Sequence, residues 1–263
     1  MEVFTASALC AGYGGVTVID GLDLGISEGE FAAIIGPNGS GKSTLVKSLT
    51  GFLKPLSGSV SFRGREIGRY SKRLLARELA SVQQFMPDPL PFRVRDFIAM
   101  GRFPHRSLLD IEGRADRLAV DNAMEMTGTS ELGDRSIDGL SGGERQMACV
   151  ARALAQEPKV IILDEPVSHL DIAHGLRIMD VLHRMHSLGV TVIAVLHDIN
   201  LASEYASRII ALKAGRLFAD GPPGKVVDYR TIEGLFDTVC IVRENPLSGK
   251  PFTYPVPGHL RKK

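Results

Sequence analysis

The sequence contains no tryptophan, only three cysteines among its 263 residues, and almost no excess of charge of one sign. Because Cys10, Cys149 and Cys240 are scattered and odd in number, they indicate neither a disulfide framework nor a zinc site. We expect three buried thiols in a protein of a reducing, cytosolic compartment. The formal net charge of +1 argues against a protein held on nucleic acid by bulk electrostatics, so no nucleic-acid partner is expected.

Long apolar runs are also missing from the chain. The longest unbroken runs, such as residues 192–196, are far shorter than the run of about 20 residues that a membrane-spanning helix needs. Residues 1–4 carry no basic region followed by an apolar stretch, so we expect no signal peptide. A content of 44% hydrophobic and 23% charged residues is typical of a soluble globular protein with one large or two small domains.

The apolar pattern predicts strands toward both ends of the chain and helices between them. Residues 31–35, 160–163 and 190–196 are uninterrupted apolar runs, typical of strands buried on both faces of a parallel sheet. Residues 18–26 alternate between apolar and polar or small residues, whereas residues 71–156 show helical spacing. This alternation predicts an α/β protein, a parallel sheet with helices on both faces and an inserted helical subdomain. Further short strands are expected at 59–62, 208–213 and 216–220.

A glycine-rich loop follows the apolar run at 31–35 and fits the pattern G-x-x-x-x-G-K-[ST]. Glycines let backbone N–H groups turn toward a bound anion without a Cβ clash, and the start of the following helix adds a partial positive charge. Lys42 would reach the β- and γ-phosphates of a nucleotide, and the Ser43 hydroxyl would bind Mg²⁺. The predicted phosphate-binding residues are Gly36, Pro37, Asn38, Gly39, Ser40, Gly41, Lys42, Ser43 and Thr44.

Two adjacent carboxylates end the apolar run at 160–163. Successive side chains on a strand point in opposite directions, so Asp164 and Glu165 would be aimed differently. Asp164 could bind Mg²⁺ through water, while Glu165 could face the γ-phosphate and polarise the attacking water. The alternative is a strand end with two solvated acids, which is the minor interpretation downstream of a phosphate loop.

Residues 140–146, Leu-Ser-Gly-Gly-Glu-Arg-Gln, lie between these two motifs and begin a further expected helix. They match the signature of ATP-binding cassette (ABC) ATPases, and the sequence resembles that family over nearly its whole length. Ser141 offers a hydroxyl, and Gly142 and Gly143 offer unhindered backbone N–H groups at a helix N-terminus, which together form a second anion site. Because one chain needs only one triphosphate, two anion sites suggest that they belong to different nucleotides. The resemblance implies that Ser141 of one copy faces the γ-phosphate held by Lys42 of a second copy.

The resemblance assigns roles to residues outside these motifs. Tyr13 matches the aromatic residue that stacks on adenine, and His197 matches the histidine that senses the γ-phosphate. Gln84 matches the glutamine that links the core to the helical subdomain. Residues 168–171 match the loop after the acidic pair, with His169 where Ala or Asn is usual. The implied cofactors are ATP and Mg²⁺; the implied catalytic residues are Glu165, His197, Lys42, Gln84 and Ser141, and the implied metal ligands are Ser43, Gln84 and Asp164.

The resemblance also implies a fold and its division. We expect a P-loop (RecA-like) core with a parallel sheet, an N-terminal antiparallel β subdomain and an inserted helical subdomain. The core and β subdomain would cover about 1–84 and 157–240, the helical subdomain about 85–156, and a C-terminal tail about 241–263.

A finer resemblance lies in residues 92–105. Their Gly-Arg-x-Pro-His ending at His105 is similar to the ATPases of iron–siderophore, haem and cobalamin importers, and molybdate importers share much of the pattern. The segment would be a short amphipathic helix with Val94, Phe97 and Ile98 inward and Arg102 at its exit, in the region that receives the permease. The alternative is a plain helix packed inside the subdomain.

The partners implied for an importer ATPase are a second copy of the chain, polytopic permease subunits and, indirectly, a substrate-binding protein, at the cytoplasmic face of the membrane. The alternative is a soluble ABC ATPase that acts on nucleic acid or a protein machine. Two further patterns have plainer explanations. His183 and His186 could ligate a metal, but no third ligand is placed. The basic run over 63–77 is interpreted as a solvated face, with phosphate-bearing partners as the minor alternative.

Overall fold

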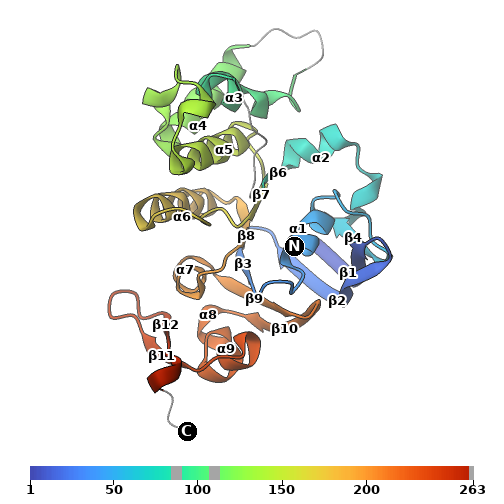
Figure 1. Ribbon diagram of the computed structural model, residues 1–263. Helices are drawn as coiled ribbons and strands as arrows, with labels where there is room; N and C mark the ends of the chain where they lie inside the picture. The colour runs from blue at the N-terminus through green and yellow to red at the C-terminus, as the bar shows by residue number, and fades with distance from the viewer. Residues whose placement is uncertain (84–90, 107–112, 261–263) are drawn as a thin grey trace. The chain divides into compact units, whose positions relative to one another are not determined.

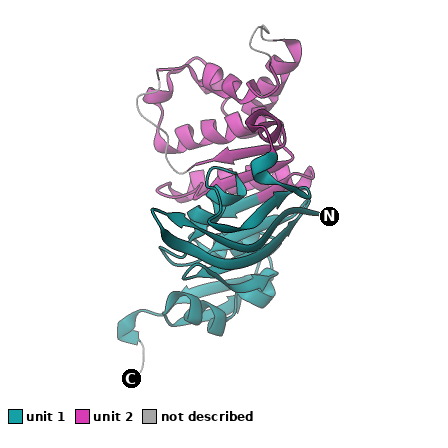
Figure 2. Cartoon of the chain, turned by 90° about the vertical axis from the view of Figure 1, so that its right-hand side faces the viewer, with its two compact units in different colours: residues 1–69, 193–263 teal, residues 70–192 magenta. Residues whose placement is uncertain are grey.

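The computed structural model describes residues 1–83, 91–106 and 113–260. The chain divides into two compact units, residues 1–69 with 193–263 and residues 70–192 (Figure 2). We call these the first and the second unit. The boundaries expected for a helical subdomain over 85–156 remain a prediction.

The N-terminal part of the first unit is an antiparallel sheet in the order β2-β1-β4-β5. Its two long strands form a hairpin across Gly14 and Gly15, whose positive φ angles of 56° and 82° suit glycine. The side chains expected to alternate inward are buried, and the rings of Phe4 and Phe62 stack with centroids 5.1 Å apart. The strands predicted over 18–26 and 59–62 are therefore confirmed as β2 (Val16–Ser27) and β4 (Ser57–Phe62). The sheet also contains β1 (Glu2–Tyr13) and β5 (Arg65–Glu66).

A second sheet of the first unit contains the strand that precedes the phosphate loop. Strand β3 (Phe31–Ile35) is buried along its whole length and pairs in parallel with β9 (Arg208–Lys213). Strand β10 (Arg216–Gly221) returns antiparallel to β9, which confirms the strands expected at 208–213 and 216–220. The end of β8 (Thr191–Val195) adjoins β3 on its other side. The remaining elements of this unit are α1 (Lys42–Leu49), η1 (Ile67–Arg69), α7 (Ile199–Tyr205), α8 (Pro223–Val226), α9 (Tyr229–Phe236), β11 (Cys240–Glu244), β12 (Pro251–Pro255) and η5 (Gly258–Leu260) (Figure 1).

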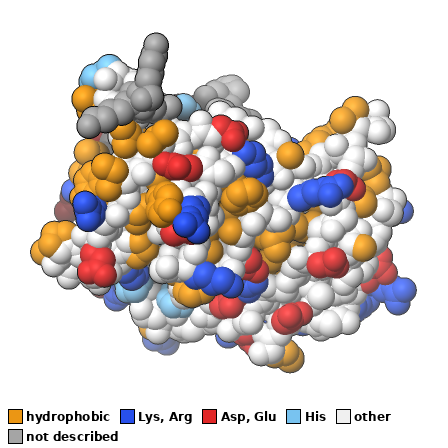
Figure 3. Space-filling model, turned by 90° about the horizontal axis from the view of Figure 1, so that it is seen from below, with side chains coloured by type: hydrophobic (Ala, Val, Ile, Leu, Met, Phe, Trp, Pro, Cys, Tyr) orange, Lys and Arg blue, Asp and Glu red, His pale blue; other side chains and the backbone are white. Residues whose placement is uncertain are grey.

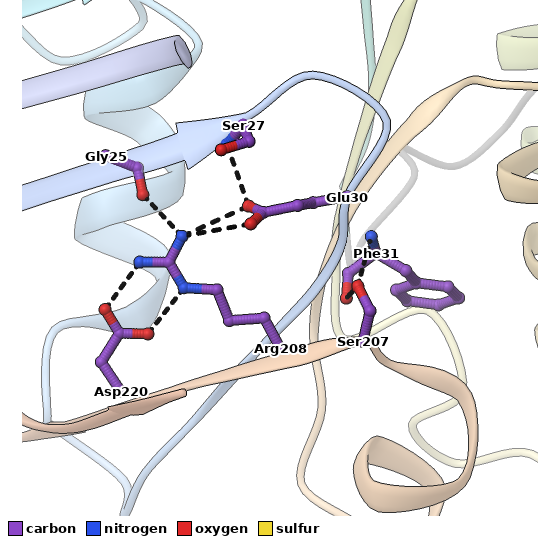
Figure 4. A network of polar contacts seen from close by, with 7 residues as sticks. All are labelled: Gly25, Ser27, Glu30, Phe31, Ser207, Arg208 and Asp220. Atoms are coloured by element: carbon purple, nitrogen blue, oxygen red, sulfur yellow. Dashed lines mark hydrogen bonds and ion pairs between the residues drawn. The ribbon is translucent and has the colours of Figure 1, made fainter. Parts of the chain in front are cut away.

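The guanidinium of Arg208 joins this sheet to the end of β2 (Figure 4). Its Nε and Nη2 donate to the two carboxylate oxygens of Asp220 at 2.7 and 2.6 Å, and its Nη1 donates to the carbonyl of Gly25 at 2.9 Å. Glu30, which also accepts from the backbone N–H of Ser27, lies 3.2 Å from the same Nη1. The hydrogen bonds that Arg208 donates to Asp220 raise the pKa of Arg208 against the effect of burial, so the network holds a permanent charge.

The second unit combines helices with two parallel strands. Strand β6 (Leu79–Val82) pairs in parallel with β7 (Val160–Asp164). The expectation that residues 71–156 are helical throughout is therefore wrong at β6, because its backbone pairing and its buried Leu79, Ala80 and Val82 outweigh local helical spacing. The helices are α2 (Lys72–Glu78), α3 (Val94–Ala99), η2 (Met100–Arg102), α4 (Arg114–Thr127), η3 (Ser130–Leu132), η4 (Ile137–Gly139), α5 (Gly142–Ala155) and α6 (Ile172–Ser187).

Arg102 lies inside the second unit rather than on its surface. Val94, Phe97 and Ile98 are buried as predicted, and the side chain of Arg102 is only 6% exposed. Its guanidinium donates to Asp116 at 3.0 Å and to the carbonyl of Ala155 at 2.7 Å. These contacts support the plainer alternative for Arg102, which is a structural residue that joins η2 to α4 and α5.

Several sequence predictions on single residue types are tested by the structure. Cys149 and Cys240 are buried, and burial raises the pKa of Cys149 to about 11. Cys10 is only partly buried, so the expectation of three buried thiols is wrong there; it lies at a register shift in the pairing of β1 with β4. Among the described residues, His183 and His186 belong to no group of metal-ligating side chains.

Two surface properties bear on partners. Within the described part of the chain, no helix combines the length and the apolar character that crossing a membrane requires. Acidic, basic and apolar side chains are interspersed on the face that Figure 3 shows, so neither sign of charge dominates there.

Candidate active site

The phosphate loop joins β3 to α1 in the first unit. Gly36, Gly39 and Gly41 have φ angles of 151°, 76° and 100°, which place them in the region that favours glycine. The Lys42 ammonium donates to the carbonyls of Gly36 and Pro37 at 2.9 and 3.0 Å, so it points back over its own loop. The Lys42 side chain, which is expected to contact the phosphates, is therefore held against the carbonyl groups of the predicted phosphate loop.

Close packing leaves no room for a side chain at Gly36 and Gly41. A Cβ on Gly36 would lie 2.2 Å from the carbonyl oxygen of Leu212, and one on Gly41 would lie 2.6 Å from Cδ1 of Ile19. Among the described residues, no side chain caps the N-terminus of α1, and its first turn holds no acidic residue. A helix start without a side-chain cap beside a lysine ammonium fits a phosphate group. Ser43, in the first turn of α1, supplies the hydroxyl that a bound Mg²⁺ would need.

His197 lies at the same edge of the sheet as this loop. The backbone N–H of Leu196 donates to the carbonyl of Ile34 at 3.0 Å, so the residues that follow β3 and β8 emerge side by side. One residue after Ile35 the phosphate loop begins, and one residue after Leu196 stands His197, which is exposed. The first unit therefore brings the predicted γ-phosphate sensor beside the predicted phosphate loop.

Tyr13 ends β1 in the same unit and keeps 46% of its surface exposed. The Lys47 ammonium of α1 lies 5.4 Å from its ring centroid, within the range of a cation–π contact. An exposed ring beside the helix that follows the phosphate loop fits the predicted stacking on adenine.

The acidic pair ends β7 in the second unit. Asp164 is the last residue of this otherwise buried strand, and Glu165 turns out of the strand with a φ of 54°, unusual for a residue other than glycine. The Ser168 hydroxyl donates to the Glu165 carboxylate at 3.1 Å. No role for Ser168 itself was predicted from the sequence. Its position three residues after Glu165 is a spacing that allows this hydrogen bond.

Ser141 is the N-cap of α5 in the same unit and forms a capping box with Glu144. Its Oγ accepts from the backbone N–H of Glu144 at 3.3 Å, and its own N–H donates to the Glu144 carboxylate at 2.8 Å. The backbone bond from Ser141, with a further contribution from Arg135, holds the pKa of Glu144 below its usual value. Ser141 is exposed, and its hydroxyl, which also hydrogen-bonds the Glu144 carboxylate, can rotate to donate its hydrogen to an approaching anion.

The two signature glycines have different surroundings. A Cβ on Gly143 would lie 2.4 Å from Cδ2 of His174, whereas a Cβ on Gly142 would meet no atom within 4 Å among the described residues. His174 is held in turn by Asp171, whose carboxylate lies 2.8 Å from Nδ1 and caps α6. His174 was not singled out in the sequence, since only the fold brings it to the signature helix.

The predicted site residues fall into the two units. Tyr13, the phosphate loop and His197 belong to the first unit, and Asp164, Glu165 and the signature residues belong to the second. Gln84 lies outside the described residues.

Comparisons with known proteins decide the family. The family model described as ABC transporter matches residues 19–168. The chain belongs to the ABC transporter ATPases. It is 40% identical to the ferric enterobactin transport ATP-binding protein FepC of Escherichia coli over 249 residues, which cover 94% of this chain and 92% of FepC. It is 41% identical to the hemin import ATP-binding protein HmuV of Rhodopseudomonas palustris, over 92% of this chain and 90% of HmuV.

A solved structure extends the likeness to the whole fold. A metal-chelate type ABC transporter in an inward-facing conformation matches with a TM-score of 0.85 and 26% identity, over 99% of this chain and 100% of the matched one. The ABC ATPase fold predicted from the sequence is thus confirmed. ABC ATP-binding subunits of transport systems bind and hydrolyse ATP to power transport, and this chain is an ATPase of that kind.

Proposed function

We propose that the chain is the ATPase of an importer for a metal chelate, and that the transported substrate is an iron–siderophore or haem. The observation that carries this proposal is the likeness over nearly the full length to FepC and HmuV, whose names state ferric enterobactin transport and hemin import. The metal-chelate type transporter that covers 99% of the chain supports the same class. Two copies would act under polytopic permease subunits as a peripheral assembly on the cytoplasmic face of the membrane.

The chain's own residues suit the hydrolysis of a nucleoside triphosphate. The phosphate loop and Lys42 would bind the β- and γ-phosphates, while Tyr13 would stack on the adenine. Ser43, Asp164 and Gln84 would hold Mg²⁺, which neutralises charge on the phosphates when bound.

Two further side chains would direct the attacking water. Glu165 would accept its proton, with Ser168 limiting the rotation of the carboxylate. His197 would hydrogen-bond the γ-phosphate.

The signature would bind the nucleotide of a second copy. Ser141 can donate its hydroxyl outward, and no described atom fills the space beside Gly142. Nothing within the described chain requires a glycine at position 142, so the requirement would come from a phosphate that approaches from outside. ATP would then hold two copies in a two-fold symmetric dimer, and closure would move the permease because ATP binds the closed state better.

The experiment is to tag the chain, solubilise membranes gently and identify what copurifies. We expect a polytopic membrane protein in equal amount and, in proteoliposomes with the matching binding protein, uptake of a radiolabelled ferric siderophore or of hemin that needs internal ATP. The Lys42→Ala complex is the matched control and should assemble without transporting. A purely soluble partner or nucleic acid would overturn the importer, and uptake of corrinoid or molybdate alone would move the substrate class.

A further inference from the structure

The C-terminal hairpin of the first unit packs on a helix that begins next to His197. Strands β11 and β12 pair antiparallel, with Val242 opposite Thr253, and β12 lies against α7 (Figure 1). Neither strand belongs to the core sheet or to any motif that binds nucleotide. The hairpin therefore has no part in the functions assigned above, and its contacts with α7 show what it does.

Asn200 in the first turn of α7 binds the backbone of β12 as a neighbouring strand would. Its Oδ1 accepts from the backbone N–H of Thr253 at 2.7 Å, and its Nδ2 donates to the carbonyl of the same residue at 3.2 Å. The Thr253 hydroxyl adds a third bond, to Oδ1 at 2.8 Å, and Thr253 is 5% exposed. One amide thus satisfies both backbone groups of a buried residue that is 53 positions away.

The next turn of α7 repeats this attachment. The Ser203 hydroxyl donates to the carbonyl of Pro251 at 2.6 Å. The Glu204 carboxylate accepts from the Ser248 hydroxyl at 2.8 Å and from Nδ2 of Asn245 at 3.3 Å. Three side chains in two turns of α7 therefore hydrogen-bond to the hairpin, both at β12 and in the loop that connects its two strands.

These contacts bear directly on His197. On one side, the bond from Leu196 to Ile34 fixes the end of β8. On the other side, Asp198 caps α7 by accepting from the N–H groups of Asn200 and Leu201 at 2.8 and 3.1 Å. A helix of seven residues is too short to hold its own direction, because isolated helices below about 12 residues are marginal in water. The direction of α7, and with it the backbone of His197, depends on what α7 packs against.

We propose that the C-terminal hairpin is a positioning element for His197 in ATP hydrolysis, and that Asn200 is the residue through which it acts. This inference rests on the proposed role of His197 at the γ-phosphate. The hairpin would fix the direction of α7, and α7 would fix the position of its N-cap, Asp198. The position of Asp198 would in turn set the orientation of the imidazole of His197, which directly precedes it. Asn200 touches no nucleotide in this arrangement and is a positioning residue.

The test is the steady-state hydrolysis of Mg-ATP by the full chain carrying Asn200→Ala. We expect kcat to fall by about 10- to 100-fold, as misplacement of a catalytic group by about 1 Å costs, while the Kd for ATP stays within about twofold. Thr253→Ala keeps both backbone bonds and should lose far less. Ile241→Ala, on the exposed face of the hairpin, is the matched control and should keep the parental kcat. An unchanged kcat in a folded Asn200→Ala protein would overturn the inference.

The double variant with Asn200→Ala and His197→Ala distinguishes a failure of this inference from a failure of the proposed role of His197. If Asn200 acts through His197, Asn200→Ala should cause no further loss of single-turnover rate in that background. Equal losses in both backgrounds would contradict the inference, and a normal rate for His197→Ala alone would contradict the proposed role of His197 instead. Should Asn200→Ala fail to fold, Asn200→Asp keeps the two accepted bonds and should give an intermediate kcat; a parental kcat in that variant would also count against the inference.

Discussion

The imidazole of His174 occupies the space in which a side chain on Gly143 would begin. A Cβ there would lie 2.4 Å from Cδ2 and 2.6 Å from Cγ of His174. The ring cannot simply turn away, because the Asp171 carboxylate lies 2.8 Å from its Nδ1 and also accepts from its backbone N–H. The second signature glycine therefore serves the packing of its own chain, whereas the space beside Gly142 is open among the described residues.

Alanine at these two neighbouring positions should separate stability from function. We expect Gly143→Ala to lower the free energy of unfolding by about 1–3 kcal/mol, as overpacking does, and Gly142→Ala to change it by less. Adding His174→Ala to Gly143→Ala should return part of the loss, because the Cβ then has room. Urea unfolding followed by circular dichroism measures all three. Equal stability of Gly142→Ala and Gly143→Ala would contradict the packing role of Gly143.

Replacement of Arg102 by methionine should destabilise the second unit strongly. The variant keeps the length of the side chain but removes the guanidinium that pairs with Asp116, which is 13% exposed, and that donates to the Ala155 carbonyl. Removing one partner of a buried pair costs about 3–5 kcal/mol, which urea unfolding would show. Arg69→Met is the matched control, since its pair with Glu66 lies at 3.1 Å with side chains 74% and 53% exposed, and it should cost under about 1 kcal/mol. Similar losses in the two variants would contradict the buried role of Arg102.

The same ion pair predicts a loss of stability in acid. Burial works to raise the pKa of Asp116, but the hydrogen bonds from Arg102 and Gly113 and the charges of two arginines outweigh it and lower that pKa below its ordinary value of 3.8. Its contribution is therefore fully present above the unfolded pKa and is lost as pH falls through the folded one. Urea unfolding between pH 6 and pH 2 should show this fall, and Arg102→Met should flatten it. An equal slope in parent and variant would contradict the assignment.

Most of the site could be predicted because each part is contiguous in the sequence. The phosphate loop, the acidic pair and the signature each carry their chemistry within nine residues or fewer, next to a strand or a helix that the apolar pattern indicates. Strand β6 could not be predicted, because its four residues follow α2 directly and its pairing with β7 spans a long stretch of chain.

Contacts distant in sequence account for the other omissions. His174 reaches Gly143, and Asn200 reaches Thr253, only after the chain has folded. Arg102 was expected at the exit of a short amphipathic helix, and the structure shows it buried against partners on α4 and after α5. No local sequence pattern predicts such contacts, because the residues that make them are ordinary polar residues.

The most direct measurement is the oligomeric state of Glu165→Gln with saturating Mg-ATP, by size exclusion with light scattering. The amide cannot take the proton of the attacking water, so ATP should persist between Lys42 of one copy and Ser141 of the other. We predict a dimer that holds two ATP molecules. Glu165→Gln combined with Ser141→Ala is the matched control, which should bind ATP in the phosphate loop and remain a monomer. A monomeric Glu165→Gln protein that nevertheless binds ATP would contradict the shared nucleotide sites.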